Sequence, residues 1–90
     1  MSNQSPPTPE EQEQYKANAV AWALQFVSRG VPADLTVADA MINVYPAHYQ
    51  EMESTGPLWR TTWHSKVYLR GGWIVDLDEQ GNSDDPPRRM

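Results

Sequence analysis

His64 and Asp78 are the pair of side chains in this sequence best placed for acid–base chemistry. They fall opposite each other across a predicted β-hairpin, so the carboxylate would orient the imidazole as a general base requires. A nucleophile would have to lie beside that imidazole, yet Ser65 is expected on the opposite face of its strand. Thr62 shares the face of His64, but nothing marks its hydroxyl as activated. The sequence therefore offers no set of nucleophile, base and orienting group, and we predict that the protein is not an enzyme.

Metal binding is the second kind of chemistry that the residue types bring into question. His48 and Glu51 would lie one turn apart on a helix, but two ligands do not complete a metal site. Residues 76–82, with the sequence DLDEQGN, resemble the start of a calcium-binding loop. The twelfth position of such a loop is Pro87 here, in place of the bidentate glutamate that calcium requires. Hence we predict neither a metal site nor any other cofactor.

Size and composition narrow the possibilities further. The chain has 90 residues, no cysteine and a formal net charge of -5, which allows one small domain and excludes disulfides and thiol chemistry. No apolar run is long enough to cross a bilayer, and the first residues lack the features of a secretory signal. We therefore expect a cytoplasmic protein without membrane attachment. Polar, proline-containing composition predicts disordered tails at 1–7 and 79–90, flanking one domain over 8–78.

A helix is predicted from about Pro9 to Arg29. Thr8 can cap its first amides, Pro9 suits the first helical position, and Glu11 completes a capping box. Gly30 follows the last turn, where glycine commonly ends a helix. Four apolar residues recur at helical spacing along this segment: Tyr15, Ala19, Trp22 and Phe26. This stripe makes the helix amphipathic, with one face to bury.

A second helical pattern follows and is interrupted by a proline. Its apolar residues are Leu35, Ala38, Ile42 and Tyr45, then Tyr49 and Met52. Pro46 removes one amide and pushes the residue before it out of helical geometry. We therefore expect either two short helices, at about 37–44 and 46–53, or one helix kinked at Pro46. Residues 54–57, with the sequence STGP, end the pattern.

From residue 59 to residue 70 the apolar period changes to two, as in a half-buried strand. Gly71 and Gly72 turn the chain, and residues 73–77 return as a second strand. A three-residue loop puts Val67 opposite Val75, whereas a two-residue loop would mix apolar and charged side chains on both faces. The same loop pairs Leu69 with Trp73, Ser65 with Leu77, and Lys66 with Asp76. The predicted fold class is α+β: a long N-terminal amphipathic helix, one or two short helices, and a C-terminal antiparallel β-hairpin packed on the helices.

The outer face of that hairpin is the predicted partner-binding surface. No acidic residue occurs between Ser54 and Val75, and Arg60 and Arg70 have no acid opposite them on the hairpin. Exposed aromatic and arginine side chains are the types that dominate protein interfaces. We therefore expect a small, acidic, non-enzymatic module, of a kind that phages and mobile elements encode, which docks on another protein as a regulator, inhibitor or assembly factor. The residues expected to bind the partner are Trp59, Arg60, Tyr68 and Arg70.

Three other interactions are open at this point. Three helices followed by a basic hairpin is the element order of a winged helix, so nucleic-acid binding is the alternative function. The third predicted helix, however, carries Glu51 and Glu53 without a basic residue, and the negative charge of the chain opposes phosphate binding. The acidic helical half could instead face a basic protein. A homodimer is expected if the helices leave part of the hairpin's apolar face uncovered.

Overall fold

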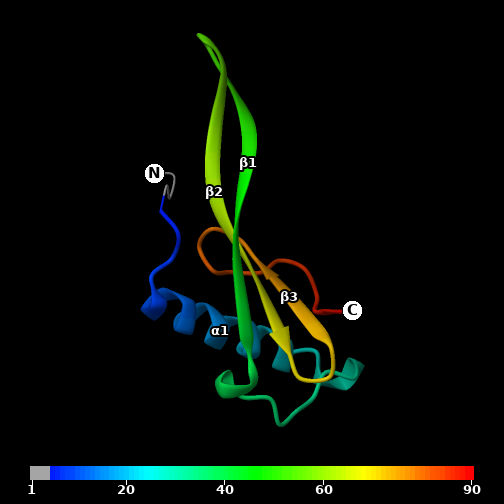
Figure 1. Ribbon diagram of the computed structural model, residues 1–90. Helices are drawn as coiled ribbons and strands as arrows, with labels where there is room; N and C mark the ends of the chain where they lie inside the picture. The colour runs from blue at the N-terminus through cyan, green and yellow to red at the C-terminus, as the bar shows by residue number, and fades with distance from the viewer. Residues whose placement is uncertain (1–4) are drawn as a thin grey trace.

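A computed structural model describes residues 5–90, in which one α-helix packs across the base of a four-stranded antiparallel sheet (Figure 1). The strands follow one another in the sheet in their chain order, β1-β2-β3-β4. The elements are α1 (Pro9–Leu24), the short 3-10 helices η1 (Val27–Arg29) and η2 (Val37–Asp39), and the strands β1 (Met41–Glu53), β2 (Gly56–Leu69), β3 (Trp73–Leu77) and β4 (Arg88–Arg89).

Helix α1 begins at the predicted residue. The amide of Glu11 donates to Thr8 Oγ1 at 3.2 Å, and the amide of Thr8 donates to Glu11 Oε1 at 3.1 Å, which completes the capping box. The helix ends earlier than predicted, at Leu24, because the amide of Phe26 bonds the carbonyl of Ala23 and the last turn tightens to 3-10 geometry.

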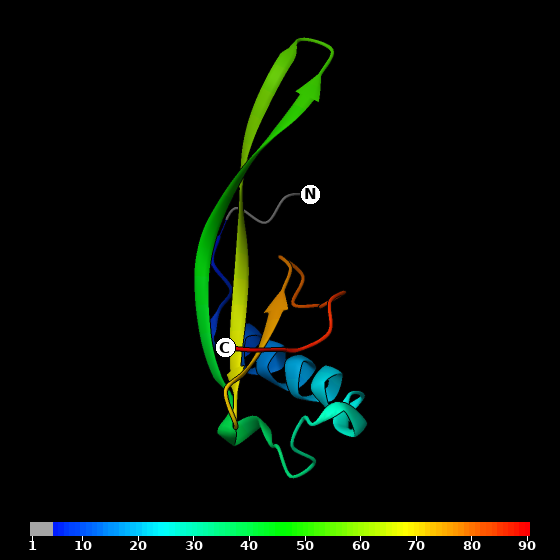
Figure 2. The ribbon, with the colours of Figure 1, turned by 90° about the vertical axis from the view of Figure 1, so that its right-hand side faces the viewer.

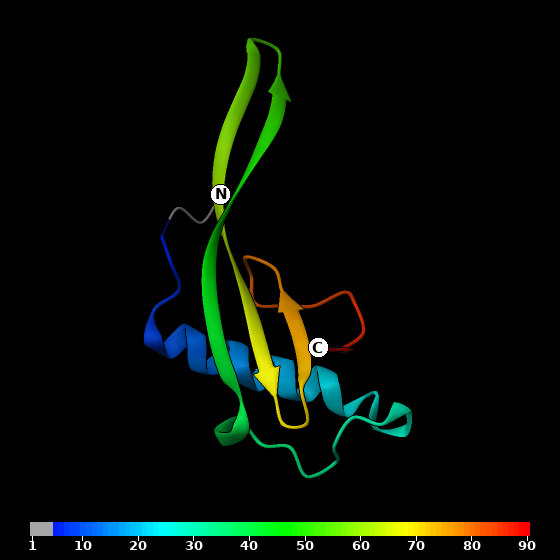
Figure 3. The ribbon, with the colours of Figure 1, turned by 45° about the vertical axis from the view of Figure 1, so that its right-hand side comes forward.

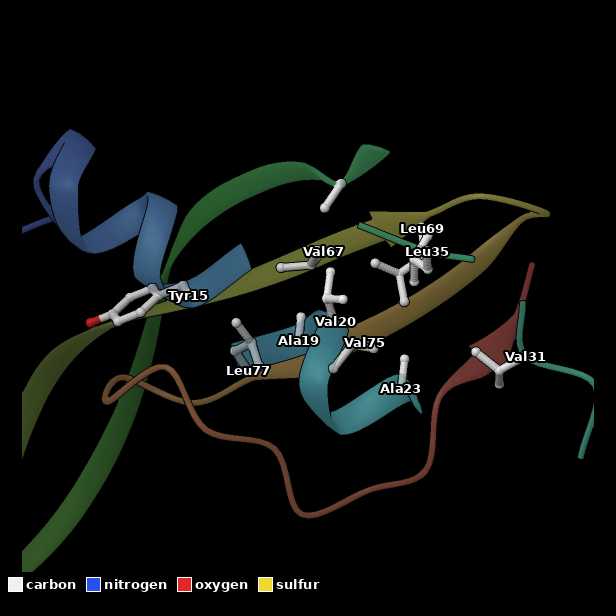
Figure 4. Close-up of a cluster of buried hydrophobic side chains, with 11 residues drawn as sticks. Tyr15, Ala19, Val20, Ala23, Val31, Leu35, Val67, Leu69, Val75 and Leu77 are labelled. Atoms are coloured by element: carbon white, nitrogen blue, oxygen red, sulfur yellow. The ribbon is translucent and has the colours of Figure 1, made fainter. Parts of the chain in front are cut away.

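The core lies between one face of α1 and the sheet, as Figure 4 shows. Two alanines on the helix, Ala19 and Ala23, are fully buried and let its backbone approach the strands closely. Val67 and Val75, paired across β2 and β3, are likewise inaccessible to solvent. The buried apolar cluster is Tyr15, Ala19, Val20, Ala23, Val31, Leu35, Ala40, Val67, Leu69, Val75 and Leu77. Of the predicted α1 stripe, Tyr15 and Ala19 are buried in this cluster, whereas Trp22 and Phe26 are only partly buried against it.

The helices predicted over 37–53 are wrong. Apart from the single turn η2, this segment is strand β1, which pairs with β2 along its whole length, from Met41 opposite Tyr68 to Glu53 opposite Gly56. Pro46 neither splits nor kinks a helix; it lies in an edge strand, where proline is tolerated because one row of amides faces away from the sheet.

The predicted fold class is corrected accordingly. The helix does precede the strands, but β2 and β3 do not form a separate C-terminal hairpin, because β1 and β4 extend them into one sheet. The element order of a winged helix is lost as well, since 41–53 is a strand. The physical reason is that β1 finds its partner in β2, a tertiary pairing that overrides its helical spacing.

The predicted register between β2 and β3 is confirmed. Val67 pairs with Val75, and the same register joins Leu69 to Trp73, Ser65 to Leu77, and Lys66 to Asp76. Gly71 and Gly72 both have φ of +84°, the left-handed region that glycine enters without steric cost. Side-chain alternation therefore predicts this pairing well, because a one-residue slip would expose the whole apolar face.

The residues after β3 fold back along α1. The Asn18 side-chain amide donates to the carbonyl of Gly81 at 3.0 Å, and Trp22 Nε1 donates to the carbonyl of Asp85 at 2.7 Å. The chain then reaches β4, which pairs with β3. The sequence predicts a disordered tail over 79–90; in the structure this segment contacts α1 and pairs with β3. Of the tail predicted at 1–7, residues 1–4 lie outside the described residues.

Beyond the body of the protein, β1 and β2 continue as a long two-stranded projection. We call residues 47–62 the arm; they pair only with one another, because β3 pairs with β2 at residues 65–69 alone. Figures 1, 2 and 3 show the arm rising and curving away from the helix. The molecule is accordingly elongated, with principal extents of 50 × 26 × 19 Å.

Ser65 provides a test of the core. Its side chain is 1% exposed, and Oγ has no hydrogen-bond partner among the described residues. Replacing a buried, unpaired hydroxyl removes an uncompensated desolvation cost, so Ser65→Ala should raise the free energy of unfolding by about 1 kcal/mol. Urea denaturation measures this change, with Ser28→Ala, at an exposed position, as the control. A loss of stability in Ser65→Ala would show that the hydroxyl is bonded in solution.

Candidate interaction surface

The structure does not bring the four predicted partner-binding residues together. Trp59 and Arg60 lie on the arm, whereas Tyr68 and Arg70 lie at and just beyond the other end of β2. A strand rises about 3.4 Å per residue, so Trp59 and Tyr68 are separated by about 30 Å. The four residues therefore belong to two separate surfaces.

Both arginines are paired with acids, contrary to the expectation that they are unmatched. Arg60 Nε lies 2.6 Å from Glu51 Oε2, an ion pair across β1 and β2 in which the N–H is not aligned as a hydrogen bond. Arg70 contacts Asp34 at 2.8 Å and Asp39 at 2.9 Å. The acids come from β1 and from the segment before it, which a hairpin considered alone does not include.

The Arg70 cluster leads to a prediction about acid stability. Hydrogen bonds from the Arg70 guanidinium, and then from the Thr36 hydroxyl, lower the pKa of Asp39 below its usual value. A depressed carboxyl pKa stabilises the fold above the pKa of the unfolded chain, and this stabilisation is lost as pH falls through the folded pKa. Arg70→Gln should therefore raise the Asp39 pKa and make the loss of stability below about pH 4 less steep.

Carboxyl carbon shifts followed by NMR through an acid titration measure the Asp39 pKa directly. Arg88→Gln is the matched control, because Arg88 pairs with Asp76 instead. An Asp39 titration that is the same in Arg70→Gln as in the parent protein would contradict the pairing.

Exposed apolar side chains are concentrated on the arm. Met52 is 77% exposed and Trp59 68% exposed, although both are large and apolar. The two side chains share one face of the arm. Trp59 lies opposite Gln50, which puts their side chains on the same face, and Met52 is two residues beyond Gln50 in the same strand. Leu58 and Tyr49 are exposed on the other face. We call Tyr49, Met52, Leu58 and Trp59 the arm tip.

Sequence reasoning found only Trp59 of the arm tip. Tyr49 and Met52 were assigned to a predicted helix, and Leu58 followed a predicted break. The signal that identifies them is the break at 54–57 taken as a hairpin: residues 54–55 turn the chain, and Gly56, with φ of +123°, begins β2 opposite Glu53.

The predicted acid–base pair does not form. His64 Nε2 lies 3.0 Å from Thr62 Oγ1, and its ring stacks on Tyr45 with centroids 6.0 Å apart. Asp78 Oδ1 instead accepts hydrogen bonds from the amides of Gln80 and Asn82, and so closes the turn after β3. The carboxylate is therefore engaged with the backbone and does not orient the imidazole.

The predicted geometry of His48 and Glu51 changes as well. Because β1 is a strand, residues three apart point to opposite faces, so the two side chains do not converge as they would on a helix. His48 Nδ1 lies 3.0 Å from Thr61 Oγ1. Within residues 5–90, no three ligand side chains gather in a way that would hold a metal ion.

No protein-family model, curated protein or solved structure matches this chain. In the part of the chain that the structure describes, no helix is long and apolar enough to cross a membrane.

Proposed function

We propose that this protein is a non-enzymatic binding module that docks on another protein through the arm tip. The observation that carries the proposal is the exposure of large apolar side chains on a projecting arm, led by Met52 and Trp59. Clustered apolar exposure is typical of protein interaction sites, and Trp and Met are enriched in their buried centres.

The arm also has a suitable shape for docking. Its tip is held away from the body by strands that continue into the helix-covered sheet, so a groove of a partner can accept it without contacting α1. Trp59 is the expected anchor, because a large aromatic side chain that becomes buried supplies much of the binding energy. Arg60, with Glu51, lies on the other face of the arm, next to Tyr49 and Leu58, and would form a polar border there. Tyr68 and Arg70 lie outside this surface.

A role as regulator, inhibitor or assembly factor follows from docking without chemistry. Such a protein acts by occupying or joining surfaces of its partner, which requires an anchor and a rigid base. The arm provides the first, and the core of α1 on β2 and β3 provides the second. The nucleic-acid alternative depended on a winged-helix order of elements, and it receives no support from a sheet with one α-helix.

Site-specific photo-crosslinking in the producing cell tests the docking proposal. The chain offers a matched pair of leucines: Leu58 on the arm is 40% exposed, and Leu24 at the end of α1 is 38% exposed. A photoreactive residue at position 58 should give a discrete cross-linked protein, which the same residue at position 24 should not give. Trp59→Ala should abolish the product.

Equal labelling from the two positions, or an undiminished product with Trp59→Ala, would contradict docking through the arm tip. Loss of the product through unfolding is excluded by thermal denaturation of each variant. Trp59 is 68% exposed, so its replacement should change the melting temperature little.

A further inference from the structure

Strand β1 leaves a long backbone edge without a partner strand. It is an outer strand of the sheet and runs for 13 residues, from Met41 to Glu53. An edge of this kind presents a row of amides and carbonyls that can template pairing with another strand. Natural edges are commonly protected by lysines, bulges or short length, and β1 contains no Lys or Arg. The residues in it of a protective type are Pro46, Glu51 and Glu53, and both glutamates lie near its end.

The backbone groups of β1 face β2 and the free edge in alternation. Pro46 has no N–H, so its position in the ladder is one whose amide side points away from β2. The Thr62 hydroxyl donates to the carbonyl of Ala47 at 3.4 Å, which places that carbonyl on the β2 side. Because these directions alternate along a strand, five residues besides Pro46 present backbone groups at the free edge: Ile42, Val44, His48, Gln50 and Met52.

The arm has a physical need for such a partner. A two-stranded hairpin alone is marginally stable in water, and α1 covers only the base of the sheet. The free edge of β2 is shorter, since β3 pairs with residues 65–69, and Thr62 and His64 line a pocket together with Asp78 and Glu79. The edge of β1 is therefore where a third strand adds most to the arm.

We propose that two copies of this chain pair antiparallel through β1, with Ala47 beside the partner's Ala47. Ala47 is the midpoint of Met41–Glu53, so this register alone puts every residue of the strand opposite a residue of the partner. Pro46, opposite the partner's His48, donates no hydrogen bond there. The twofold-related pairing joins the two sheets into one continuous sheet. The arm of each copy then lies along the base of β1 in the other.

Side chains agree with this register. Half-buried Ile42 faces the partner's Met52, and half-buried Tyr45 faces the partner's Tyr49, so the exposed Met52 and Tyr49 side chains gain apolar neighbours. Asn43 faces the partner's Glu51, and no like charges meet. A register centred on Met52 would instead set Glu51 against the partner's Glu53, which like-charge repulsion disfavours.

The pairing does not rest on the proposed docking function. It uses the backbone of β1, and Tyr49 and Met52 of the arm tip lie beside the pairing. Leu58 and Trp59 lie on β2 and stay available on the dimer. Trp59→Ala should therefore leave dimerisation unchanged, and failure of one proposal does not imply failure of the other.

A single engineered cysteine tests the register, because the chain has no cysteine of its own. In the proposed dimer Ala47 and its twofold copy form a non-hydrogen-bonded pair with Cα atoms about 4.5 Å apart, within disulfide range. Ala47→Cys should oxidise to a disulfide-linked dimer. His48→Cys is the matched control: position 48 is more exposed, but its two copies would lie beyond the roughly 7 Å that a disulfide can span.

Sedimentation of the unmodified chain and of Gln50→Pro completes the test without a disulfide. The unmodified chain should sediment as a dimer. Gln50→Pro removes one outward-facing N–H from each copy, so the dimer loses two hydrogen bonds. It should weaken association by at least about tenfold. The proposal is overturned by a chain that stays monomeric at high concentration, by a Gln50→Pro dimer of unchanged affinity, or by His48→Cys that cross-links as readily as Ala47→Cys.

Discussion

Gly81→Ala should lower the free energy of unfolding by about 3 kcal/mol, which combines backbone strain with steric overlap. Gly81 has φ of +79°, a conformation that residues with a Cβ rarely adopt. A Cβ at this position would overlap the ring of Tyr15, which is buried at the start of the core. For a domain of this size the melting temperature should fall by more than about 10 °C.

Gly72→Ala separates the two causes. Gly72 has φ of +84°, but no atom lies within 4 Å of a Cβ built there, so only the strain of about 1 kcal/mol applies. Urea denaturation of both variants measures the difference. Equal losses would contradict the packing of the 78–82 turn against α1, and with it the place of the C-terminal segment in the fold.

Leu77→Ala should destabilise the protein by about 3 kcal/mol, because it removes a buried side chain and leaves a cavity. Leu77 is 3% exposed in β3, beneath α1. Leu58→Ala is the matched control in the same sheet: at 40% exposure its truncation should cost less than about 1 kcal/mol. The midpoints of urea denaturation give both values.

The contrast between the two leucines tests where the core ends. The structure confines the core to the base of the sheet and leaves the arm outside it. A Leu58→Ala variant as unstable as Leu77→Ala would show that the arm tip is buried in solution, and would remove the basis for docking through it.

The features that the sequence predicts correctly depend either on residues close in the chain or on keeping one face of a strand pair apolar. The start of α1 depends on bonds between Thr8 and Glu11, only three residues apart. The β2–β3 register depends on keeping valines and leucines on one face across a short turn. In both cases the competing arrangement leaves polar groups unpaired or apolar groups exposed.

Strand β1 could not be predicted in the same way. Ile42, Tyr45, Tyr49 and Met52 satisfy a helical spacing, and much of the strand is exposed on both faces, so no alternation of burial identifies it. Pro46 then appeared to divide a helix, although an edge strand tolerates proline equally well. What decides the segment is its pairing with β2, a contact that its own residues do not encode.

Only part of the candidate surface could be predicted, because the position of β1 was not known from the sequence. Trp59 was identified because its own position marks it as exposed, and the structure places it on the arm at 68% exposure. Arg60 and Arg70 were expected to be free, but Glu51, Asp34 and Asp39 reach them from segments whose position depends on β1.

The arm is the feature on which both the docking surface and the dimer depend, and nuclear Overhauser contacts test it most directly. The structure predicts cross-strand contacts between backbone protons of Gln50 and Trp59 and of His48 and Thr61. Contacts between residues three or four apart within 46–53, without any to 56–61, would show a helix in place of β1 and would contradict the account.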